Sequence, residues 1–301
     1  MNRSLIIGCN GQDGRLLQAR LAEEGSEVTA LGRGDLLLED SVAVRRLVKQ
    51  GFQEIYYLAA HHHSSEEIVD SGYLSLYLSS VSVNMNGLMH FLEAILHHSP
   101  ATRLFYAGSS LVFGAAGQDM QDEQTPFDPR CIYGITKSTG LRLCRYYRDN
   151  HGVFAAGGIL FNHESSIRSQ KFVIPKIIHA ALAIASGTQK TLKLGTLSSR
   201  VDWGYAADYV RAMIAILRLP APDDFVIATG VTHSVQDAVE IVFTHLGLDW
   251  RKHVEEAPQI LVRKRTVLCG NAAKLRRETG WSPTIGFKEM LIHLVETARN
   301  A

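Results

Sequence analysis

The 301-residue sequence has few cysteines and no long hydrophobic run. Its four cysteines, Cys9, Cys131, Cys144 and Cys269, follow no CxxC or zinc-ligand spacing, so we expect neither a disulfide framework nor a metal site. No stretch reaches the roughly 18 apolar residues of a membrane-spanning helix. The opening MNRSLIIGCNG has too short an apolar run for a signal peptide. The cytoplasm is therefore the expected location, and no membrane partner is expected.

Charge is almost balanced, because Lys plus Arg number 31 and Asp plus Glu number 30, for a formal net charge of +1. No basic excess marks nucleic acid as a partner, so any bound phosphate must be held by a local site. With 46% hydrophobic residues, the chain can bury a large core. Its length suits one large domain or two closely joined ones.

Short apolar runs alternate with helical patterns through the first half of the chain. Buried runs predict strands over residues 4–7, 28–31, 54–60, 103–107 and 153–160. Helical periodicity begins at residue 16 and returns over 42–50, 84–96 and 133–150. Such alternation indicates a parallel sheet covered on both faces. Because crossovers are right-handed, we expect a doubly wound α/β fold, the Rossmann arrangement.

The rhythm loosens after residue 161. Residues 186–205 are typical of loops and short strands, and helical patterns return over 206–217, 234–246 and 287–299. We therefore expect a first domain over residues 1–161 and a smaller substrate-binding lobe over 162–301. Part of this second half, at about 200–230, is expected to return to the first domain.

Three glycines, Gly8, Gly11 and Gly14, form the pattern GxxGxxG between the first predicted strand and the first predicted helix. Glycine tolerates positive φ and lets a pyrophosphate approach the backbone closely. The free amides and dipole of the helix N-terminus then face the phosphates. In this strand–turn–helix context, the pattern predicts that residues 1–161 bind a dinucleotide.

The loop LGRGD, at residues 31–35, ends the second predicted strand. An arginine in this place suits the 2′-phosphate of NADP, whereas an acid suits the ribose hydroxyl of NAD. Arg33 therefore favours NADP, and Asp35 keeps NAD as the alternative.

Tyr133 and Lys137 form a YxxxK pair at the start of a long predicted helix, so both lie on one helix face. A nearby ammonium is expected to stabilise the phenolate and lower the pKa of the tyrosine, which makes Tyr133 a candidate general base. Ser109 and Ser110 follow a predicted strand, where a hydroxyl can point into the ligand crevice. A serine hydroxyl there can bond the substrate hydroxyl that Tyr133 deprotonates.

Together, GCNGQDG, YLAAHHH, NMNGLMHFLEA, GSSLVFG and YGITK resemble motifs of the extended short-chain dehydrogenases. In the second half, GILFNHESSIRSQKFV, SRVDWGYAADYV, DDFVIATGVTHSV and GNAAKLRRETGWSP resemble GDP-mannose 4,6-dehydratases. The resemblance extends from Leu5 to about Leu294. It implies NADP as cofactor, a GDP-sugar as substrate and a homo-oligomer, either a dimer or a tetramer.

The resemblance also assigns roles by position. It places Ser109 where the family has a catalytic threonine, and it places Arg33 at the 2′-phosphate of the cofactor. The residues implied in catalysis are Ser109, Tyr133 and Lys137. Those implied in cofactor binding are Gly8, Gly11, Gln12, Asp13, Gly14, Arg33, Asp35, Leu36, Leu58, Ala59, Ala60, Tyr133 and Lys137. Those implied in substrate binding are Ser109, Ser110, Asn162, Arg168 and Arg200.

The sequence departs from this family pattern in several places. Leu111 stands where the dehydratases carry the glutamate that removes the C5 proton and helps to expel water from C6, and leucine has no ionisable group for either task. Val201 replaces the arginine before Asp-Trp-Gly, with Arg200 one place earlier. The segment 261–271 lacks the Arg-Pro-x-Glu-Val pattern, although Arg263 and Arg265 are candidates to replace it.

Three consecutive histidines, His61, His62 and His63, follow the third predicted strand, where the family pattern has one. Neighbours on a strand alternate faces, so three in a row cannot all ligate one ion. Loop packing is the main expectation, and proton transfer by His62 or His63 is the alternative. His163 is expected to be structural.

Three functions are compatible with these residues. The first is 4,6-dehydration of a GDP-hexose: oxidation at C4, loss of water across C5 and C6, and return of hydride to C6. The second is reduction or epimerisation at C4 of a related GDP-sugar, which needs the Ser-Tyr-Lys set but no glutamate at position 111. The third is a regulatory paralogue that binds nucleotide without turnover, although the retained Tyr-Lys pair argues against it. The sequence leaves open which hexose or heptose is modified.

Overall fold

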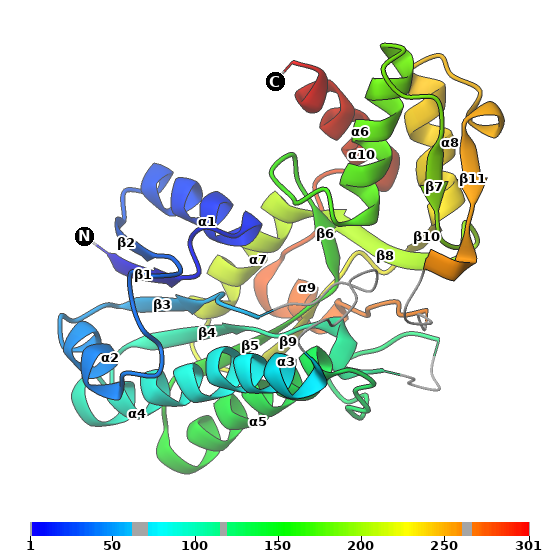
Figure 1. The fold of residues 1–301 in the computed structure, drawn as a ribbon. Helices are drawn as coiled ribbons and strands as arrows, with labels where there is room; N and C mark the ends of the chain where they lie inside the picture. The colour runs from blue at the N-terminus through cyan, green and yellow to red at the C-terminus, as the bar shows by residue number, and fades with distance from the viewer. Residues whose placement is uncertain (1, 62–71, 115–118, 261–266, 301) are drawn as a thin grey trace.

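The apolar runs of the first half form buried parallel strands in the computed structural model, which describes residues 2–61, 72–114, 119–260 and 267–300 (Figure 1). A sixth strand joins them from the second half. The strands of this sheet are β1 (Arg3–Ile7), β2 (Glu27–Leu31), β3 (Glu54–Tyr57), β4 (Arg103–Ala107), β5 (Ala155–Leu160) and β9 (Asp224–Ile227). Their spatial order is β2-β1-β3-β4-β5-β9, and every neighbouring pair is parallel. The predicted doubly wound sheet is confirmed, and the strand order reverses between β1 and β3, where such folds bind ligands.

Helices cover both faces of the sheet, as Figure 1 shows. On one face lie α1 (Gln12–Glu23) and α7 (Ala206–Leu217), with α9 (Ala273–Thr279) packed against α7 and β9. On the other face lie α2 (Ser41–Val48), α3 (Gly72–Val81), α4 (Leu88–His98) and α5 (Ile132–His151). Helix α5 ends at Gly152, whose φ of +68° closes the helix in the left-handed conformation that glycine adopts without strain. Sheet and helices together bury one hydrophobic core.

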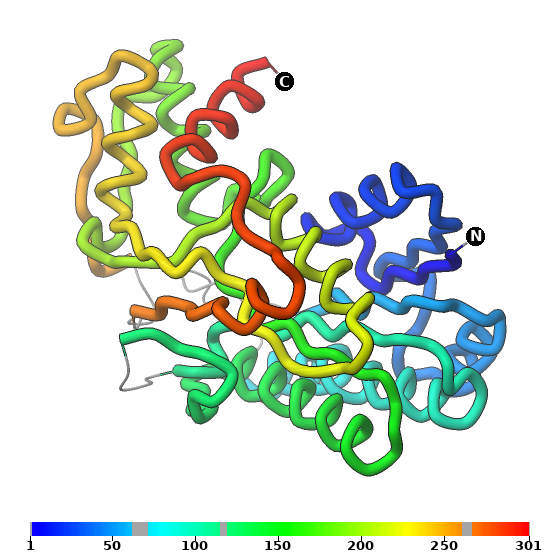
Figure 2. The backbone as a smooth tube through the Cα atoms, turned by 180° about the vertical axis from the view of Figure 1, so that it is seen from behind, coloured from blue at the N-terminus to red at the C-terminus, as the bar shows by residue number. Residues whose placement is uncertain are grey.

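A smaller lobe with its own hydrophobic core lies over the carboxyl ends of the strands (Figures 1 and 2). Its helices are α6 (Val173–Ala185), α8 (Val235–His245) and α10 (Phe287–Arg299). Its strands are β6 (Asn162–Glu164), β7 (Leu192–Leu194), β8 (Arg200–Tyr205), β10 (Thr232–Ser234) and β11 (Val254–Glu256), paired in the orders β10-β8-β6 and β11-β7. Between these segments the chain returns to the larger body to supply α7, β9 and α9, so the two lobes are interleaved.

Several elements differ from the sequence patterns. Helices α3, α6 and α9 are not predicted, and a π-helical segment, Ser82–Gly87, leads into α4 where one continuous helix is expected. Helix α6 contains Pro175 in its first turn, a position where proline is tolerated because the N–H has no intrahelical partner. Within the described ranges, none of the helices has the length and apolar character needed to cross a membrane.

Candidate active site

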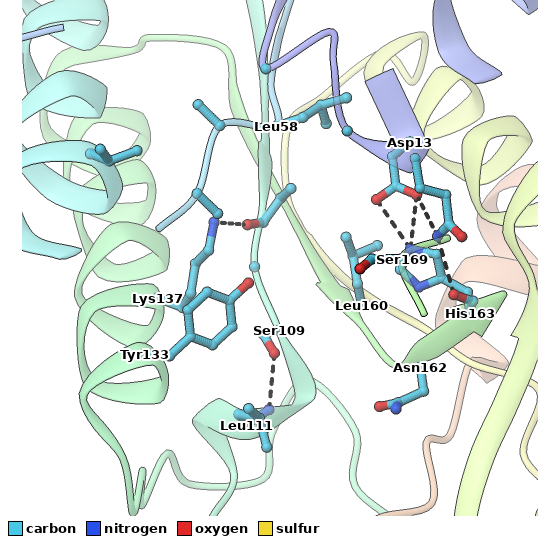
Figure 3. A pocket seen from close by; sticks show the side chains of 18 of the residues that line it. Asp13, Leu58, Ser109, Leu111, Tyr133, Lys137, Leu160, Asn162, His163 and Ser169 are labelled. Atoms are coloured by element: carbon cyan, nitrogen blue, oxygen red, sulfur yellow. Dashed lines mark hydrogen bonds and ion pairs between the residues drawn. The ribbon is translucent and has the colours of Figure 1, made fainter. Parts of the chain in front are cut away.

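A cavity of about 1160 Å³ lies between the carboxyl ends of the sheet strands and the smaller lobe (Figure 3). Residues at the ends of β1, β2, β4 and β5 line it, together with the loop after β3, the start of α5 and the segment after β5. Its volume exceeds the roughly 300–1,000 Å³ of pockets for drug-sized ligands. The cavity can therefore accommodate a ligand, or a pair of ligands, of larger size.

The glycine turn after β1 forms one end of this cavity. Gly8 has φ +99°, and its N–H donates to the Leu31 carbonyl at 2.8 Å. A Cβ on Gly14 would lie 2.5 Å from the Gly8 carbonyl oxygen, so only glycine lets α1 pack this closely against the turn. Gly8 and Gly11 line the cavity. Helix α1 therefore begins at the cavity, where its free backbone N–H groups can donate hydrogen bonds to a diphosphate.

The first two residues of α1 contact the smaller lobe as well as the cavity. Gln12 Nε2 donates to the His163 carbonyl at 3.1 Å. The Asp13 carboxylate lies 3.0 Å from His163 Nε2. Burial alone would raise the pKa of Asp13, but His163 and Arg168 hold it below its ordinary value. Asp13 is thus an ionised, paired carboxylate at the boundary between the two lobes.

The loop after β2 presents Arg33, Leu36 and Glu39 to the cavity. Arg33 is exposed, whereas the Asp35 carboxylate folds back onto its own loop and accepts the Gly32 N–H at 2.7 Å. Glu39, which no motif in the sequence indicates, accepts a hydrogen bond from the Ser82 hydroxyl. Of the two loop residues considered for the adenosine ribose, Arg33 is the one that lines the cavity.

The segment after β3 leaves the sheet to line the cavity with Leu58, Ala59 and Ala60. The strand ends at Tyr57, three residues earlier than expected. His61 donates its backbone N–H to Asn84 Oδ1 at 3.2 Å. The hypotheses for His62 and His63 concern residues outside the described ranges, as do those for Arg263 and Arg265.

The three predicted catalytic residues come together on one wall of the cavity. Figure 3 shows the Tyr133 ring between the side chains of Lys137 and Ser109. Lys137 Nζ donates to the Ala107 carbonyl at 2.7 Å and lies 5.8 Å from the centre of the Tyr133 ring. Ser109 Oγ accepts the Leu111 N–H at 3.3 Å. The C-terminal end of β4 and the first turn of α5 therefore position the set.

The electrostatics of this wall differ from the expectation. Burial raises the pKa of Tyr133 well above its ordinary value, and the charge of Asp13 raises it further, while Arg168 lowers it. Burial lowers the pKa of Lys137 to about 7. The expected lowering of the tyrosine pKa by Lys137 is therefore not found, because the amine is itself desolvated and bonded to the Ala107 carbonyl.

Position 111 faces the cavity and carries no acid. Leu111 lines the cavity with 37% of its surface exposed, whereas the neighbouring Ser110 is buried. The carboxylates on the described part of the lining are Asp13, Glu39 and Asp202, and each is bonded to a protein group. Within the described part of the lining, none of these three acids is therefore available for the role of a glutamate at position 111.

The predicted substrate residues lie on the opposite wall. Asn162, Arg168 and Arg200 all line the cavity. Arg168 Nη1 donates to the His163 carbonyl at 2.8 Å, and its guanidinium lies 3.8 Å from the ring centre of Phe172. Arg200 Nη2 donates to the Thr232 carbonyl at 2.5 Å across the β8–β10 pair. Two arginines are therefore held at fixed places on this wall.

Three further charged residues of the lining were not predicted from the sequence: Arg130, Lys171 and Asp202. Asp202 is buried, and it accepts the N–H groups of Thr229 at 3.0 Å and Gly270 at 3.1 Å. It thereby joins β8, next to Arg200, to two loops of the larger body. The long motifs around these residues were visible, but only the fold shows which members face the cavity.

Residues 31–294 match the family model described as GDP-mannose 4,6 dehydratase. The chain belongs to the GDP-mannose 4,6-dehydratase family. "GDP-mannose 4,6 dehydratase 1" of Arabidopsis thaliana is 34% identical over 97% of this chain and 88% of that protein. "GDP-mannose 4,6-dehydratase" of Vibrio cholerae is 30% identical over 97% of this chain and 92% of that protein. This family consists of dehydratase enzymes of the extended short-chain dehydrogenase type.

Several solved structures have the same fold as this chain. The structure of RMD from Pseudomonas aeruginosa complexed with NADPH has a TM-score of 0.86 at 20% identity, covering all of both chains. The dTDP-glucose 4,6-dehydratase from Bacillus anthracis in complex with NAD has a TM-score of 0.85 at 18% identity, covering all of this chain and 97% of that one. At such identities the likeness shows the fold alone.

Proposed function

We propose that the chain transfers hydride at C4 of a GDP-linked hexose with NADP as cofactor, as a GDP-mannose 4,6-dehydratase. The observation that carries this proposal is the meeting of Ser109, Tyr133 and Lys137 in the cavity that the glycine turn opens into. Family membership and the curated relatives named for this activity support it. Bound NADP would supply the acceptor and donor of the hydride.

Each residue of the wall then has a role at a stated atom. As C4 is oxidised, its hydroxyl proton passes to Tyr133 while the phenol proton of Tyr133 passes on to the amine of Lys137, and Ser109 Oγ bonds the C4 oxygen. Lys137, with its pKa lowered to about 7, can exchange a proton near neutral pH and bond the ribose. A substrate hydroxyl bound to Tyr133 is a hydrogen-bond partner that itself loses its proton in the reaction.

The groups at the dinucleotide end fit NADP. The turn at Gly8 leaves no room for a Cβ, which would lie 2.7 Å from the Ala59 nitrogen, and α1 begins at the cavity. Arg33 is an exposed cation that lines the cavity, where it suits a 2′-phosphate. Glu39 is the competing feature, since a carboxylate suits the ribose hydroxyl of NAD. Solved relatives of this fold are complexed with NADPH or with NAD.

The opposite wall fits a sugar nucleotide. Arg130, Arg168, Lys171 and Arg200 all line the cavity, and they bring positive charge to the lobe that closes it. A guanidinium matches the geometry of a phosphate oxygen pair. We propose that these residues bind the diphosphate of the GDP-sugar and that Asn162 contacts the sugar nucleotide beside them.

A second candidate function is reduction or epimerisation at C4 of a 4-keto sugar nucleotide. The exposed position of Leu111 on the cavity wall favours it, because hydride transfer needs the wall of Ser109, Tyr133 and Lys137 but no acid at position 111. Dehydration needs a group that removes the C5 proton.

One pair of incubations separates the dehydratase from the reductase. Purified protein is given GDP-mannose without added cofactor, and separately the 4-keto-6-deoxy product with NADPH. Formation of a 4-keto sugar in the first incubation supports the dehydratase, and consumption of NADPH only in the second supports the reductase. Tyr133→Phe should lower either turnover by about 10²-fold or more. Near-normal turnover of this variant would remove the tyrosine from the mechanism.

We also propose that the chain forms a homodimer, or a tetramer built from it, through α3. This helix has no charged residue, and Tyr73, Leu74, Tyr77 and Leu78 on it are 43–70% exposed. An apolar face of this kind is typical of an interface. Leu78→Lys should lower the molar mass measured by light scattering, whereas Val42→Lys on α2 should not.

We also propose that the protein is located in the reducing cytoplasm, and its four free cysteine thiols support this proposal.

A further inference from the structure

His163 occupies a junction between the two lobes, where the glycine-turn end of the cavity meets the wall that carries Asn162 and Arg168. It lies on β6 and is buried, with its ring stacked on Tyr209 of α7 at 4.4 Å between ring centres. Its Nδ1 lies 2.7 Å from the Phe161 carbonyl oxygen, and its Nε2 lies 3.0 Å from the Asp13 carboxylate. The two ring nitrogens therefore join β6 to the glycine turn, and the contact with Asp13 pairs His163 with an ionised carboxylate across the two lobes.

A second connection runs beside this pair. Gln12 Nε2 donates to the His163 carbonyl at 3.1 Å, and Ser165 Oγ donates to Gln12 Oε1 at 2.7 Å. The first turn of α1 thus binds the segment 163–165 through the hydrogen bonds of Gln12 as well as through the pairing of Asp13 with His163. This is the same turn that opens the dinucleotide end of the cavity.

The segment bound in this way carries residues that face the proposed site of the sugar nucleotide. Asn162 precedes His163 on β6 and lines the cavity, as does Arg168. Arg168 donates to the His163 carbonyl at 2.8 Å and forms an ion pair with Glu164 at 3.1 Å. Figure 3 shows Asn162, His163 and Asp13 in sequence along this wall. His163 is therefore the shared anchor between the glycine turn and the residues proposed to bind the sugar nucleotide.

We infer that His163 is a positioning residue, which fixes the segment 162–168 to the glycine turn through Asp13 and Gln12 and thereby sets the sugar nucleotide in register with the cofactor. The inference rests on the proposed function, because it needs two ligands in one cavity. Hydride transfer requires reacting atoms about 3–3.5 Å apart, and a shift of about 1 Å can cost about 10²-fold in rate. A rigid connection between the two ligand-bearing segments supplies this register.

The test measures GDP affinity by calorimetry on protein saturated with NADPH. His163→Leu removes both ring bonds and should weaken GDP binding about tenfold or more, the loss expected for a charge-assisted hydrogen bond. His163→Gln keeps an N–H near the place of Nε2 and should stay within about threefold of the wild type. Ser165→Ala removes only the bond to Gln12 and should weaken GDP binding about threefold, which keeps the test available if His163→Leu does not fold.

The matched control is Glu54→Gln at the opposite end of the sheet. Glu54 is buried and paired with Arg218 at 3.2 Å, so its substitution should lower the melting temperature without changing GDP affinity. Unchanged GDP affinity in His163→Leu and Ser165→Ala would overturn the inference, and so would an equal loss in Glu54→Gln. Wild-type protein with no measurable GDP affinity would contradict the proposed function, and the inference with it.

Discussion

Replacing Lys137 with methionine should stabilise the nucleotide-free protein, and the gain should grow as the pH falls. Lys137 is 1% exposed, and burial lowers its pKa from 10.5 to about 7. Between about pH 7 and pH 10.5 the unfolded chain therefore binds more protons at this lysine than the folded chain does. The contribution of this group to stability rises with pH through that window and is lowest below about pH 7.

The size of the effect follows from the same shift. The difference between 10.5 and about 7 is 3.5 pKa units, which at 1.36 kcal/mol per unit is a penalty of about 5 kcal/mol below pH 7. Raising the pH from 7 to 9 should remove about 2 kcal/mol of it. Methionine brings no charge into the core, but it leaves the Ala107 carbonyl without this donor, at a cost of about 1–3 kcal/mol that does not depend on pH.

Urea unfolding of both proteins, stripped of nucleotide, at pH 6, 7, 8 and 9 measures the difference directly. The exposed Lys193 on β7 provides the control, since Lys193→Met should show no such pH-dependent difference. A difference between Lys137→Met and the wild type that stays constant over this range would refute the argument from desolvation. After NADP is added back, the turnover of Lys137→Met should be lower than that of the wild type by about 10²-fold, so that stability and activity move in opposite directions.

Three other substitutions address cofactor choice, the glycine turn and the elimination step. Arg33→Ala should reduce the preference for NADPH over NADH by about tenfold or more, and an unchanged ratio of dissociation constants would exclude the arginine from the 2′-phosphate. Gly14→Ala should destabilise the fold by about 1–3 kcal/mol, because its Cβ would lie 2.5 Å from the Gly8 carbonyl oxygen; urea unfolding tests this. Leu111→Glu should raise formation of the 4-keto-6-deoxy sugar from GDP-mannose by about 10²-fold, with Leu111→Gln as control. Equal rates in these two variants would show that position 111 does not carry the elimination.

The sequence predicts the sheet well because buried parallel strands leave a strong signal. The strand Arg103–Ala107 and the helices Ala206–Leu217 and Phe287–Arg299 have the expected bounds. Helix α3 was missed because its sequence, GYLSLYLSSV, has no polar face: most of its apolar residues are exposed and only Ser80 is buried. Periodicity detects a helix by the contrast between its faces, and this helix has little.

The candidate site shows the same division between pattern and geometry. The motifs bring Gly8, Ser109, Tyr133 and Lys137 to one cavity, because each stands at the end of a strand or the start of a helix. The direction of the Asp35 carboxylate and the desolvation of Lys137 depend on local packing, which no motif encodes. The pairing of Asp13 with His163 joins residues 150 positions apart, and spacing along the chain gives no sign of it.

The interleaved path of the chain limits how this protein can be assembled. Strand β9 completes one edge of the six-stranded sheet, and Trp281 donates its indole N–H to the Asp208 carbonyl of α7 at 2.8 Å. A ribosome that has released only residues 1–161 has therefore delivered a sheet with an open edge and one face lacking α7. The nucleotide-binding half cannot finish folding before most of its neighbour has been translated, and a fragment cut at residue 161 should aggregate rather than fold.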